Sequence, residues 1–262
     1  MNRKQIDILI LITIAILIIL GNYLVYDNYF GHDTIRIANW NLDVFGPTKS
    51  SNINLMKTYA GKIENYDIVF VQEIRDISNA SFPELCLMLA NYSCLSSSRA
   101  GRSSSKEQYG IIYRDGINVT SFRDFNPDSL NRWERPPIEV SFDVNGYRLN
   151  IYNIHTKPDD TQKELGYLED VIGNYGNVIV LGDLNADCSY YNNRKETEFD
   201  SWHWAVKDYD DTTSSTSTKC AYDRILLNND AYHEFESYGV DKKGITEKVS
   251  DHDIVWVKMR VD

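Results

Sequence analysis

The pattern of hydrophobic and polar positions divides the chain into two parts. Residues 6–25 contain only two strongly polar residues, Asp7 and Asn22, and both lie near the ends of the stretch. About 20 apolar residues span the hydrocarbon core of a bilayer, so the stretch predicts one N-terminal transmembrane helix. Arg3 and Lys4 precede it, which favours a cytoplasmic N-terminus. A cleaved signal peptide is the alternative, and in both cases we expect the rest of the chain outside the cytoplasm.

After this stretch, short apolar runs rich in β-branched residues recur along the chain, and their length favours strands. The runs are IRIANW (35–40), DIVFVQEI (67–74), YGIIYR (109–114), RLNIYNIH (148–155), NVIVLGD (177–183), YDRILL (222–227) and DIVWVKM (253–259). Two amphipathic stretches predict helices, with apolar positions at Leu55, Tyr59 and Ile63 in one and Leu165, Leu168, Val171 and Ile172 in the other. We therefore expect a membrane anchor with a short linker over residues 1–33 and one α/β domain with two packed sheets over residues 34–262.

Composition and charge narrow the class of protein. The 262 residues are 42% hydrophobic and 25% charged, as in an ordinary globular domain, and the formal net charge is −11. Such a charge argues against a nucleic-acid binder held by bulk positive charge. It does not exclude a nuclease, because a metal-dependent site needs clustered carboxylates and only a local basic rim to contact phosphates.

The chain has four cysteines, at positions 86, 94, 188 and 220. An even number in an exported domain indicates two disulfides. Four cysteines allow three pairings, and their spacing alone does not choose among them. The sequence has no Cys-x-x-Cys pair, so we do not expect a zinc site.

Nearly every predicted strand has polar residues of a similar chemical type at one end. A single such residue is more often solvated than catalytic, but recurrence on six strands is harder to dismiss. The residues are Asn39, Asn41, Gln72, Glu73, His155, Asp183, Asn185, Asp223, Asp251 and His252. Carboxylates, amides and two imidazoles, without a lysine or serine nucleophile, suit a hard divalent cation combined with proton transfer.

The motifs around these residues resemble the ordered signature of the endonuclease/exonuclease/phosphatase superfamily. They are WN (40–41), QE (72–73), His155, GDLNAD (182–187) and SDH (250–252). Within the superfamily, the chain is most similar to pancreatic-type deoxyribonuclease I, through FGPTKSS (45–51), VQEIRD (71–76), GRSSSKEQY (101–109), GDLNADCSY (182–190) and TSTKCAYDRI (216–225). The resemblance covers residues 34–262 and implies a four-layer α/β sandwich, with two packed mixed sheets flanked by helices.

The resemblance also implies roles for individual residues. The catalytic residues would be His155 with Glu107, His252 with Asp223, and Asp183 and Asn185 beside the scissile phosphate. The ligands of Mg²⁺ or Mn²⁺ would be Asn41, Glu73, Asp183 and Asp251, and a structural Ca²⁺ would lie at Asp211, Thr216 and Thr218. The DNA backbone would contact Arg75, Arg102, Arg135, Tyr190 and Tyr222. The resemblance pairs Cys188 with Cys220, which leaves Cys86 and Cys94 to pair by elimination.

We therefore expect a divalent-metal-dependent endodeoxyribonuclease with little sequence specificity, displayed outside the cell on a single-pass membrane anchor or secreted after signal cleavage. DNA and the membrane are the expected partners, and no feature of the sequence indicates an obligate protein partner. The alternatives are a phosphodiesterase or phosphatase of the same superfamily that acts on lipid head groups, and an inactive DNA-binding relative. Ser105 stands where the matched enzyme has a tyrosine that stacks in the minor groove, which weakens the expected engagement of that groove.

Overall fold

A computed structural model describes residues 5, 12–14, 16, 33–173, 175–192 and 195–261. The chain divides into two units, Met1–Asp33 and Thr34–Asp262. In the first unit, residues 5, 12–14 and 16 are helical. Among all described residues, no helix has both the length and the apolar character needed to cross a membrane. Most of the predicted transmembrane segment lies outside the described residues, so the anchor stays a prediction.

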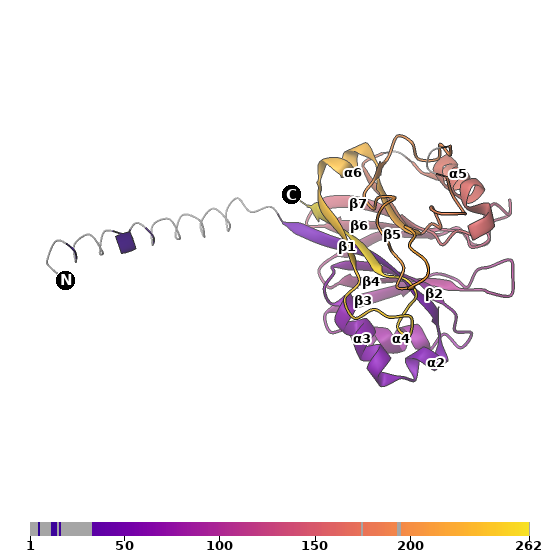
Figure 1. Cartoon of the computed structure of the whole chain (residues 1–262), viewed down its shortest axis with the longest axis horizontal. Coiled ribbons are helices and arrows are strands. Elements are labelled where there is room, and N and C mark those ends of the chain that lie inside the picture. Colours follow the sequence, from indigo (N-terminus) through magenta and orange to yellow (C-terminus); the bar gives the residue numbers. More distant parts are fainter. Residues whose placement is uncertain are drawn as a thin grey trace. The chain divides into compact units, whose positions relative to one another are not determined.

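The second unit is built on two mixed β-sheets, each with six strands among the described residues (Figure 1). The first sheet contains β1 (Thr34–Phe45), β2 (Ile68–Ile74), β3 (Tyr92–Ser96), β4 (Gln108–Arg114), β11 (Phe235–Asp241) and β12 (Ile254–Arg260), in the order β11-β12-β1-β2-β4-β3. The second contains β5 (Asn118–Asp124), β6 (Ile138–Val144), β7 (Tyr147–Asn153), β8 (Asn177–Asp183), β9 (His203–Trp204) and β10 (Asp223–Leu227), in the order β5-β6-β7-β8-β10-β9. Strand β1 is parallel to β2, and β7 is parallel to β8. The other neighbouring strands are antiparallel.

Helices cover the outer faces of both sheets, whereas α6 (Asn229–His233) packs its buried residue Ala231 against the core between the sheets. The helices of the second unit are α2 (Pro47–Ser50), α3 (Ile53–Ile63), α4 (Ser81–Cys86), η1 (Pro158–Asp160), α5 (Thr161–Val171) and α6. Tyr59 of α3 packs with Trp40 of β1 on the first sheet, and Leu165 of α5 packs with Val180 of β8 on the second. The layers therefore follow the order helix, sheet, sheet, helix, which confirms the predicted sandwich.

The alternation of side chains along each strand determines which residues enter the layer between the sheets. On β1, Ile35 and Ile37 belong to the core between the sheets, whereas Ala38 and Trp40 pack under the helices. Because side chains alternate with a period of two, the row that starts at Ile35 continues through Asn39 and Asn41. By the same rule, the side chains of four other strands that point between the sheets include a polar residue at one end of the row. These residues are Gln72 on β2, Asn153 on β7, Asp183 on β8 and Asp223 on β10. The layer between the sheets is thus apolar along most of its length and polar at one end.

Strand direction explains why these polar ends meet. Strands β1, β2, β7 and β8 contribute their carboxyl ends to the polar edge. Strands β4, β10 and β12 are antiparallel to neighbours in this set, so they contribute their amino ends. Glu107 immediately precedes β4, Asp223 begins β10, and His252 lies two residues before β12. Segments far apart in the sequence therefore supply one edge of the sandwich.

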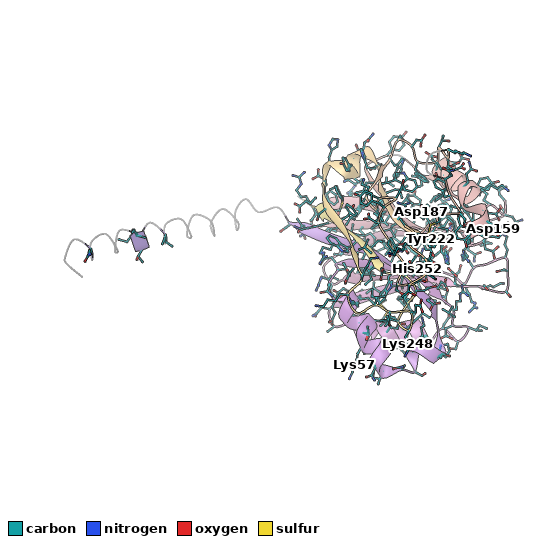
Figure 2. The ribbon with its side chains drawn as sticks, in the orientation of Figure 1. Lys57, Asp159, Asp187, Tyr222, Lys248 and His252 are labelled. Atoms are coloured by element: carbon teal, nitrogen blue, oxygen red, sulfur yellow. A yellow bond between two sulfur atoms is a disulfide. The ribbon has the colours of Figure 1, made fainter. Side chains whose placement is uncertain are left out.

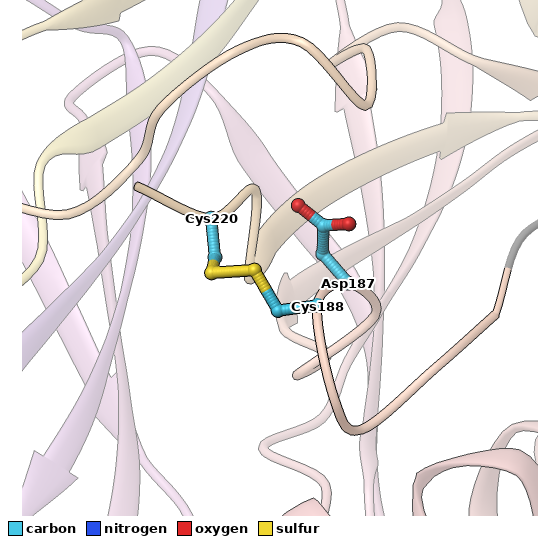
Figure 3. Close-up of side chains that lie close together, drawn as sticks. All are labelled: Asp187, Cys188 and Cys220. Carbon is cyan, nitrogen blue, oxygen red and sulfur yellow. A yellow bond between two sulfur atoms is a disulfide. The ribbon is translucent and has the colours of Figure 1, made fainter. Parts of the chain in front are cut away.

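Two local features fix the backbone near this edge. Gly182 has φ +153°, and a Cβ atom at this position would lie 1.9 Å from the carbonyl oxygen of Ile154. Only glycine allows the backbones following β7 and within β8 to approach so closely. Disulfides join Cys86 to Cys94 and Cys188 to Cys220, and Figure 3 shows the second one beside Asp187. The second disulfide connects the segment that leaves β8 to the segment that enters β10.

Candidate active site

Two histidine–carboxylate pairs form the centre of the polar edge. His155 Nδ1 lies 2.7 Å from Glu107 Oε1, and His252 Nδ1 lies 2.7 Å from Asp223 Oδ2. Glu107 and Asp223 are buried, with exposed fractions of 1% and 0%. Each pair joins the two sheets, because Glu107 and His252 border strands of the first sheet and His155 and Asp223 border strands of the second. A carboxylate at Nδ1 keeps the proton on that nitrogen and fixes the orientation of the ring. The Nε2 atom is then the one that can exchange a proton.

Asp183 lies between the two imidazoles. Its Oδ2 atom is 3.4 Å from His155 Nε2 and 3.5 Å from His252 Nε2. The Nδ2 group of Asn41 donates a hydrogen bond of 3.1 Å to the same oxygen. The backbone N–H of Asn185, which has φ +48°, donates to the other oxygen, Oδ1. Four groups therefore hold one carboxylate in a fixed orientation.

The electrostatics of the site favour charged imidazoles. Burial lowers the pKa of His155, but the Glu107 and Asp183 carboxylates together outweigh this effect, and the net pKa is raised. Burial likewise opposes the charge on His252, yet Asp223 and Asp183 raise its pKa well above the ordinary value. Burial also disfavours the Asp183 carboxylate, and the charges of His252 and His155 more than compensate, so the pKa of Asp183 is lowered. The site thus combines two histidines with raised pKa values and an ionised acid within reach of both.

A buried amide network supports this arrangement from below. The Asn39 Nδ2 group donates to Gln72 Oε1 at 3.3 Å and to Asp223 Oδ1 at 3.5 Å. Asn153 donates to Asn39 Oδ1 at 2.9 Å, and the backbone N–H of Asp183 donates to Gln72 Oε1 at 2.8 Å. The amides connect strands of both sheets, and all three amide side chains are fully buried. This network restrains the relative position of the two histidine pairs.

The predicted cation ligands are linked to one another by hydrogen bonds and by the interaction of their charges. Asn41 Nδ2 also donates to Glu73 Oε1 at 3.2 Å, so it bridges Glu73 and Asp183. Burial raises the pKa of Asp251, and the negative charges of Asp43 and Glu73 raise it further against the opposing charge of His252. Each of these carboxylates makes ionisation of the others less favourable. A bound divalent cation would offset this repulsion between their negative charges. Oxygen donors of this kind fit Mg²⁺ or Mn²⁺.

Groups of possible metal ligands among the described residues overlap with the predicted ligands only at Glu73 and Asp183. Glu73, Glu107 and His155 present ligand atoms within 4.8 Å of one another, and so do Asp183, Asp223 and His252. A further group contains Asp187, Cys188 and Cys220. Its two sulfur atoms are bonded to each other, so they are not free to bind a metal.

The predicted DNA-contact residues differ in their accessibility. Tyr190 and Tyr222 are partly exposed, and their ring centroids are 5.6 Å apart. Burial raises the pKa of Tyr222, which Figure 2 labels, and the charges of Tyr190 and Asp183 raise it further. Arg75 Nη2 lies 2.8 Å from Glu73 Oε2, and Arg102 lies on an exposed loop with Nε 3.5 Å from Glu134. All four side chains are at least partly exposed, and their contact with DNA stays a prediction.

Arg135 occupies a different place from the one that the resemblance implied. It is only 6% exposed, and its guanidinium donates to the backbone oxygens of His155 and Thr156. It therefore lies beneath the site and holds the backbone of His155. A rim contact with DNA would require these hydrogen bonds to break.

Of the three residues of the predicted calcium site, Asp211 and Thr218 both contact the hydroxyl of Thr213. Asp211 Oδ2 is 2.9 Å from the ammonium group of Lys242, which already supplies a positive charge. Thr216 is exposed, and the carbonyl oxygen of Thr218 accepts a hydrogen bond from Thr213. A cation at Asp211 Oδ2 would have to displace Lys242, and the calcium site stays a prediction.

Some residues of the site were not identified from the sequence. Asn153 belongs to the amide network, Tyr109 Oη accepts from the backbone of His155, and Thr212 Oγ1 accepts from the backbone N–H of Asp223. A signal exists for Asn153, because it lies two residues before His155 and therefore shares its face of the strand. Thr212 follows no such pattern, since its role depends on a loop.

Comparison with known proteins identifies the family. The sequence matches the endonuclease/exonuclease/phosphatase family over residues 38–252. It is 33% identical to deoxyribonuclease-1 of Gallus gallus over 231 residues, which cover 79% of this chain and 81% of that protein. It is 32% identical to deoxyribonuclease gamma of Mus musculus over 224 residues, which cover 75% of this chain and 72% of that protein. The chain belongs to the endonuclease/exonuclease/phosphatase family.

Solved structures agree on the fold. A family member from Bacteroides vulgatus superimposes with a TM-score of 0.65 at 18% identity, covering 88% of this chain and 100% of that one. A mannosyl-6-phosphatase from Bacteroides thetaiotaomicron gives a TM-score of 0.64 at 16% identity, covering 85% of this chain and 98% of that one. Similarity at this level of identity establishes the shared architecture alone.

Proposed function

We propose that the chain is a divalent-metal-dependent endodeoxyribonuclease that hydrolyses DNA phosphodiester bonds with little sequence specificity. The observation that carries the proposal is the convergence of His155 Nε2 and His252 Nε2 on one oxygen of Asp183, at 3.4 Å and 3.5 Å. Each imidazole is held by its own buried carboxylate. The arrangement supplies two titratable nitrogens on either side of one small space.

Phosphodiester hydrolysis needs two proton transfers, and the two histidines can provide them. One imidazole, in its neutral form, takes a proton from the attacking water, and the other, in its charged form, donates a proton to the leaving oxygen. Asp183 accepts a hydrogen bond from the water and so directs its lone pair toward phosphorus. Glu107 and Asp223 keep both Nδ1 atoms protonated, which leaves Nε2 as the atom that exchanges the proton.

Residues Asn41, Glu73, Asp183 and Asp251 would hold the cation. A bound Mg²⁺ or Mn²⁺ would supply positive charge to the phosphoryl oxygens, worth several kcal/mol of transition-state stabilisation. Without it, a phosphate would meet Asp183, Glu73 and Asp251 with like charge. The fit of oxygen donors and the raised pKa of Asp251 support the assignment of these four residues.

Two observations favour DNA as the substrate over a lipid head group. Relatives named deoxyribonuclease are 30–34% identical to this chain over most of its length. The tyrosine pair Tyr190 and Tyr222 and the arginines Arg75 and Arg102 line the edge, where they can contact sugars and phosphates of a polynucleotide. Backbone contacts of this kind carry no sequence information, which accounts for the low specificity that we propose.

We also propose that the enzyme acts outside the cell on a membrane anchor. The apolar stretch at residues 6–25 supports the anchor, and the two disulfides support an oxidising compartment. Protease added to intact cells should release a fragment that contains nearly the whole of Thr34–Asp262. A domain that resists protease until the cells are lysed would contradict this location.

The activity is tested by incubating the purified full chain in detergent with supercoiled plasmid and Mg²⁺, Mn²⁺ or EDTA. We expect conversion to nicked and then linear DNA with either cation and none with EDTA. His252→Gln, prepared in the same way, serves as the control for a contaminating nuclease. Release of head groups from phospholipid vesicles without cleavage of plasmid would instead favour the lipid phosphodiesterase.

A further inference from the structure

Lys242 lies between two acidic side chains close to the catalytic edge. Its Nζ atom is 2.9 Å from Asp211 Oδ2 and 3.5 Å from Asp253 Oδ2. The Asp253 side chain is only 2% exposed, and its Oδ2 atom has no hydrogen-bond partner among the residues that the structure describes. Within the described part of the chain, the ammonium group pairs with both carboxylates, one of which is buried. Removing it would leave the buried carboxylate without compensation.

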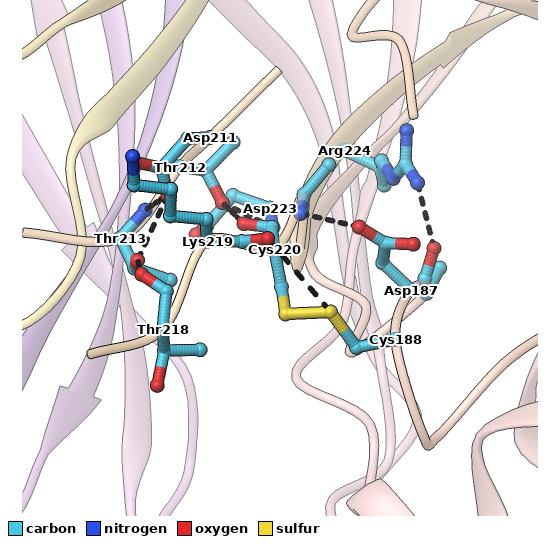
Figure 4. The surroundings of a disulfide bond; sticks show 12 residues. Asp187, Cys188, Asp211, Thr212, Thr213, Thr218, Lys219, Cys220, Asp223 and Arg224 are labelled. Atoms are coloured by element: carbon cyan, nitrogen blue, oxygen red, sulfur yellow. Dashed lines mark hydrogen bonds between the residues drawn. A yellow bond between two sulfur atoms is a disulfide. The ribbon is translucent and has the colours of Figure 1, made fainter. Parts of the chain in front are cut away.

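The second oxygen of Asp211 organises the loop that follows. Asp211 Oδ1 accepts from the backbone N–H of Thr213 at 3.1 Å and from its hydroxyl at 2.9 Å (Figure 4). The same hydroxyl contacts the carbonyl oxygen of Thr218 at 2.7 Å. Both carboxylate oxygens of Asp211 are thus engaged, one by the loop and one by Lys242. The loop keeps its form through these contacts.

This loop is connected directly to the second histidine pair. Thr213 forms an antiparallel bridge with His252. Thr212 Oγ1, one residue earlier, accepts from the backbone N–H of Asp223 at 3.2 Å. One short segment therefore touches both the imidazole-bearing residue and its carboxylate partner.

Two backbone hydrogen bonds hold this loop to the segment before β12. One runs from the Asp253 N–H to the carbonyl oxygen of Thr212, at 2.8 Å. The other runs from the Ser214 N–H to the carbonyl oxygen of Asp251, at 2.9 Å. These bonds enclose His252 on both sides. The position of its imidazole therefore depends on how firmly the loop is held, and Lys242 holds the loop through Asp211.

We propose that Lys242 is a positioning residue whose ammonium group takes the place of a bridging divalent cation between Asp211 and Asp253. It clamps residues 211–214 against residues 250–253 and so fixes His252 beside Asp223. The clamp itself follows from the contacts of the chain. Its effect on turnover rests on the proposed nuclease function. The predicted Ca²⁺ is not required at this position, because a side chain supplies the charge.

The clamp is tested first by thermal unfolding of the full chain, without any assay of activity. In EDTA, Lys242→Met should lower the Tm by about 3 °C or more, because two carboxylates then face each other without a counter-charge. Millimolar Ca²⁺ should restore most of this loss, since the vacated space lies between carboxylate oxygens. Lys242→Arg keeps the charge and should stay close to the wild type. Lys243→Met is the control, because the Lys243 side chain forms no ion pair with any residue that the structure describes. This variant should be stabilised by Ca²⁺ only as much as the wild type is.

Turnover of plasmid DNA at saturating Mg²⁺ provides the second test. Lys242→Met should lower kcat by about 10-fold with little change in KM, as is typical when a supporting residue is lost. Lys242→Arg should have a kcat close to that of the wild type. Added Ca²⁺ should raise the kcat of Lys242→Met and leave the kcat of the wild type and of Lys242→Arg unchanged. Equal Ca²⁺ stabilisation of the wild type and Lys242→Met, or an unchanged Tm of Lys242→Met in EDTA, would overturn the clamp. If the wild type cleaves no DNA with any cation, the proposed function fails, and the unfolding experiment still decides the clamp.

Discussion

His155 and His252 reach the same oxygen atom from opposite sheets. Their Nε2 atoms lie 3.4 Å and 3.5 Å from Asp183 Oδ2, although the two residues are nearly a hundred positions apart in the sequence. Each histidine is paired with a carboxylate from the other sheet. Two equivalent and separately supported imidazoles are the arrangement that a reaction with two proton transfers requires.

Replacing either histidine by glutamine should lower turnover by about 10²–10⁴-fold, because glutamine keeps hydrogen bonding but has no titratable nitrogen. The double variant should lose less than the product of the single losses, since both residues act in one transition state. Plasmid nicking at saturating cation measures the effect. His203→Gln is the control, because its ring stacks on Tyr232 and its Nε2 contacts Asn229. If His252→Gln kept more than about a tenth of the activity, the two-histidine scheme would be replaced by one with Asp183 as the base.

The pH dependence of turnover should have two limbs, both above the ordinary histidine value of 6.5, because the pKa values of both histidines are raised. The histidine that accepts a proton works only when neutral, so the rate rises as the pH passes its pKa. The histidine that donates works only when charged, so the rate falls as the pH passes its pKa. Glu107→Gln removes the anion that raises the pKa of His155 and should move one limb to lower pH.

Asp223→Asn should move the other limb in the same direction, because Asp223 raises the pKa of His252. The limb that each variant moves then identifies the base and the acid. Rates measured on plasmid from about pH 5 to about pH 10 cover the range that an imidazole with a raised pKa requires. Unshifted limbs in both variants would show that the dyads do not set the titration.

Gly182→Ala should prevent folding or lower the free energy of unfolding by more than about 4 kcal/mol. The added Cβ would overlap the carbonyl oxygen of Ile154, and φ is +153° at this position. Gly61→Ala is the matched control, because a Cβ there meets no atom within 4 Å and the residue lies inside α3. The control should raise stability by about 0.5–1 kcal/mol. Urea unfolding measures both, and a Gly182→Ala protein of wild-type stability would disprove the close approach.

Removing the disulfide between Cys188 and Cys220 should cost more stability than removing the one between Cys86 and Cys94. The sequence separations are 32 and 8 residues. In the chain-entropy model, loops of these lengths correspond to about 3.7 and about 2.5 kcal/mol. Paired Cys→Ala variants of each disulfide, compared by urea unfolding, give the two values. A larger loss for the pair at 86 and 94 would show that native contacts outweigh loop length here.

The central strands and the site at their ends could be predicted from the sequence because both depend on local patterns. The apolar run of β8 and the change to Gly182 and Asp183 lie within seven residues, and the period of two fixes the face on which Asp183 lies. By contrast, β5 is largely exposed and has no apolar run, so its position becomes evident only from its pairing with β6. Sequence patterns report burial, and an exposed edge strand gives little such signal.

The sequence could not indicate contacts that depend on packing between distant segments. Arg135 lies in a matched motif, yet its guanidinium is buried under the backbone of His155. Asn39 and Asn153 meet across 114 residues, and Lys242 meets Asp211 across 31. Each of these side chains is equally plausible on a solvated surface. Only the arrangement of the sheets decides which of them support the site.

The pairing of each histidine with a carboxylate from the opposite sheet has a consequence for the timing of activity during synthesis. A growing chain that has reached residue 222 has its first pair but lacks both members of the second. The second pair is complete only after residue 252 has been added and its strand has joined the sheet. If the proposed nuclease function is correct, no incomplete chain made during translation can cleave DNA. A ribosome that stalls before residue 252 therefore releases an inactive product.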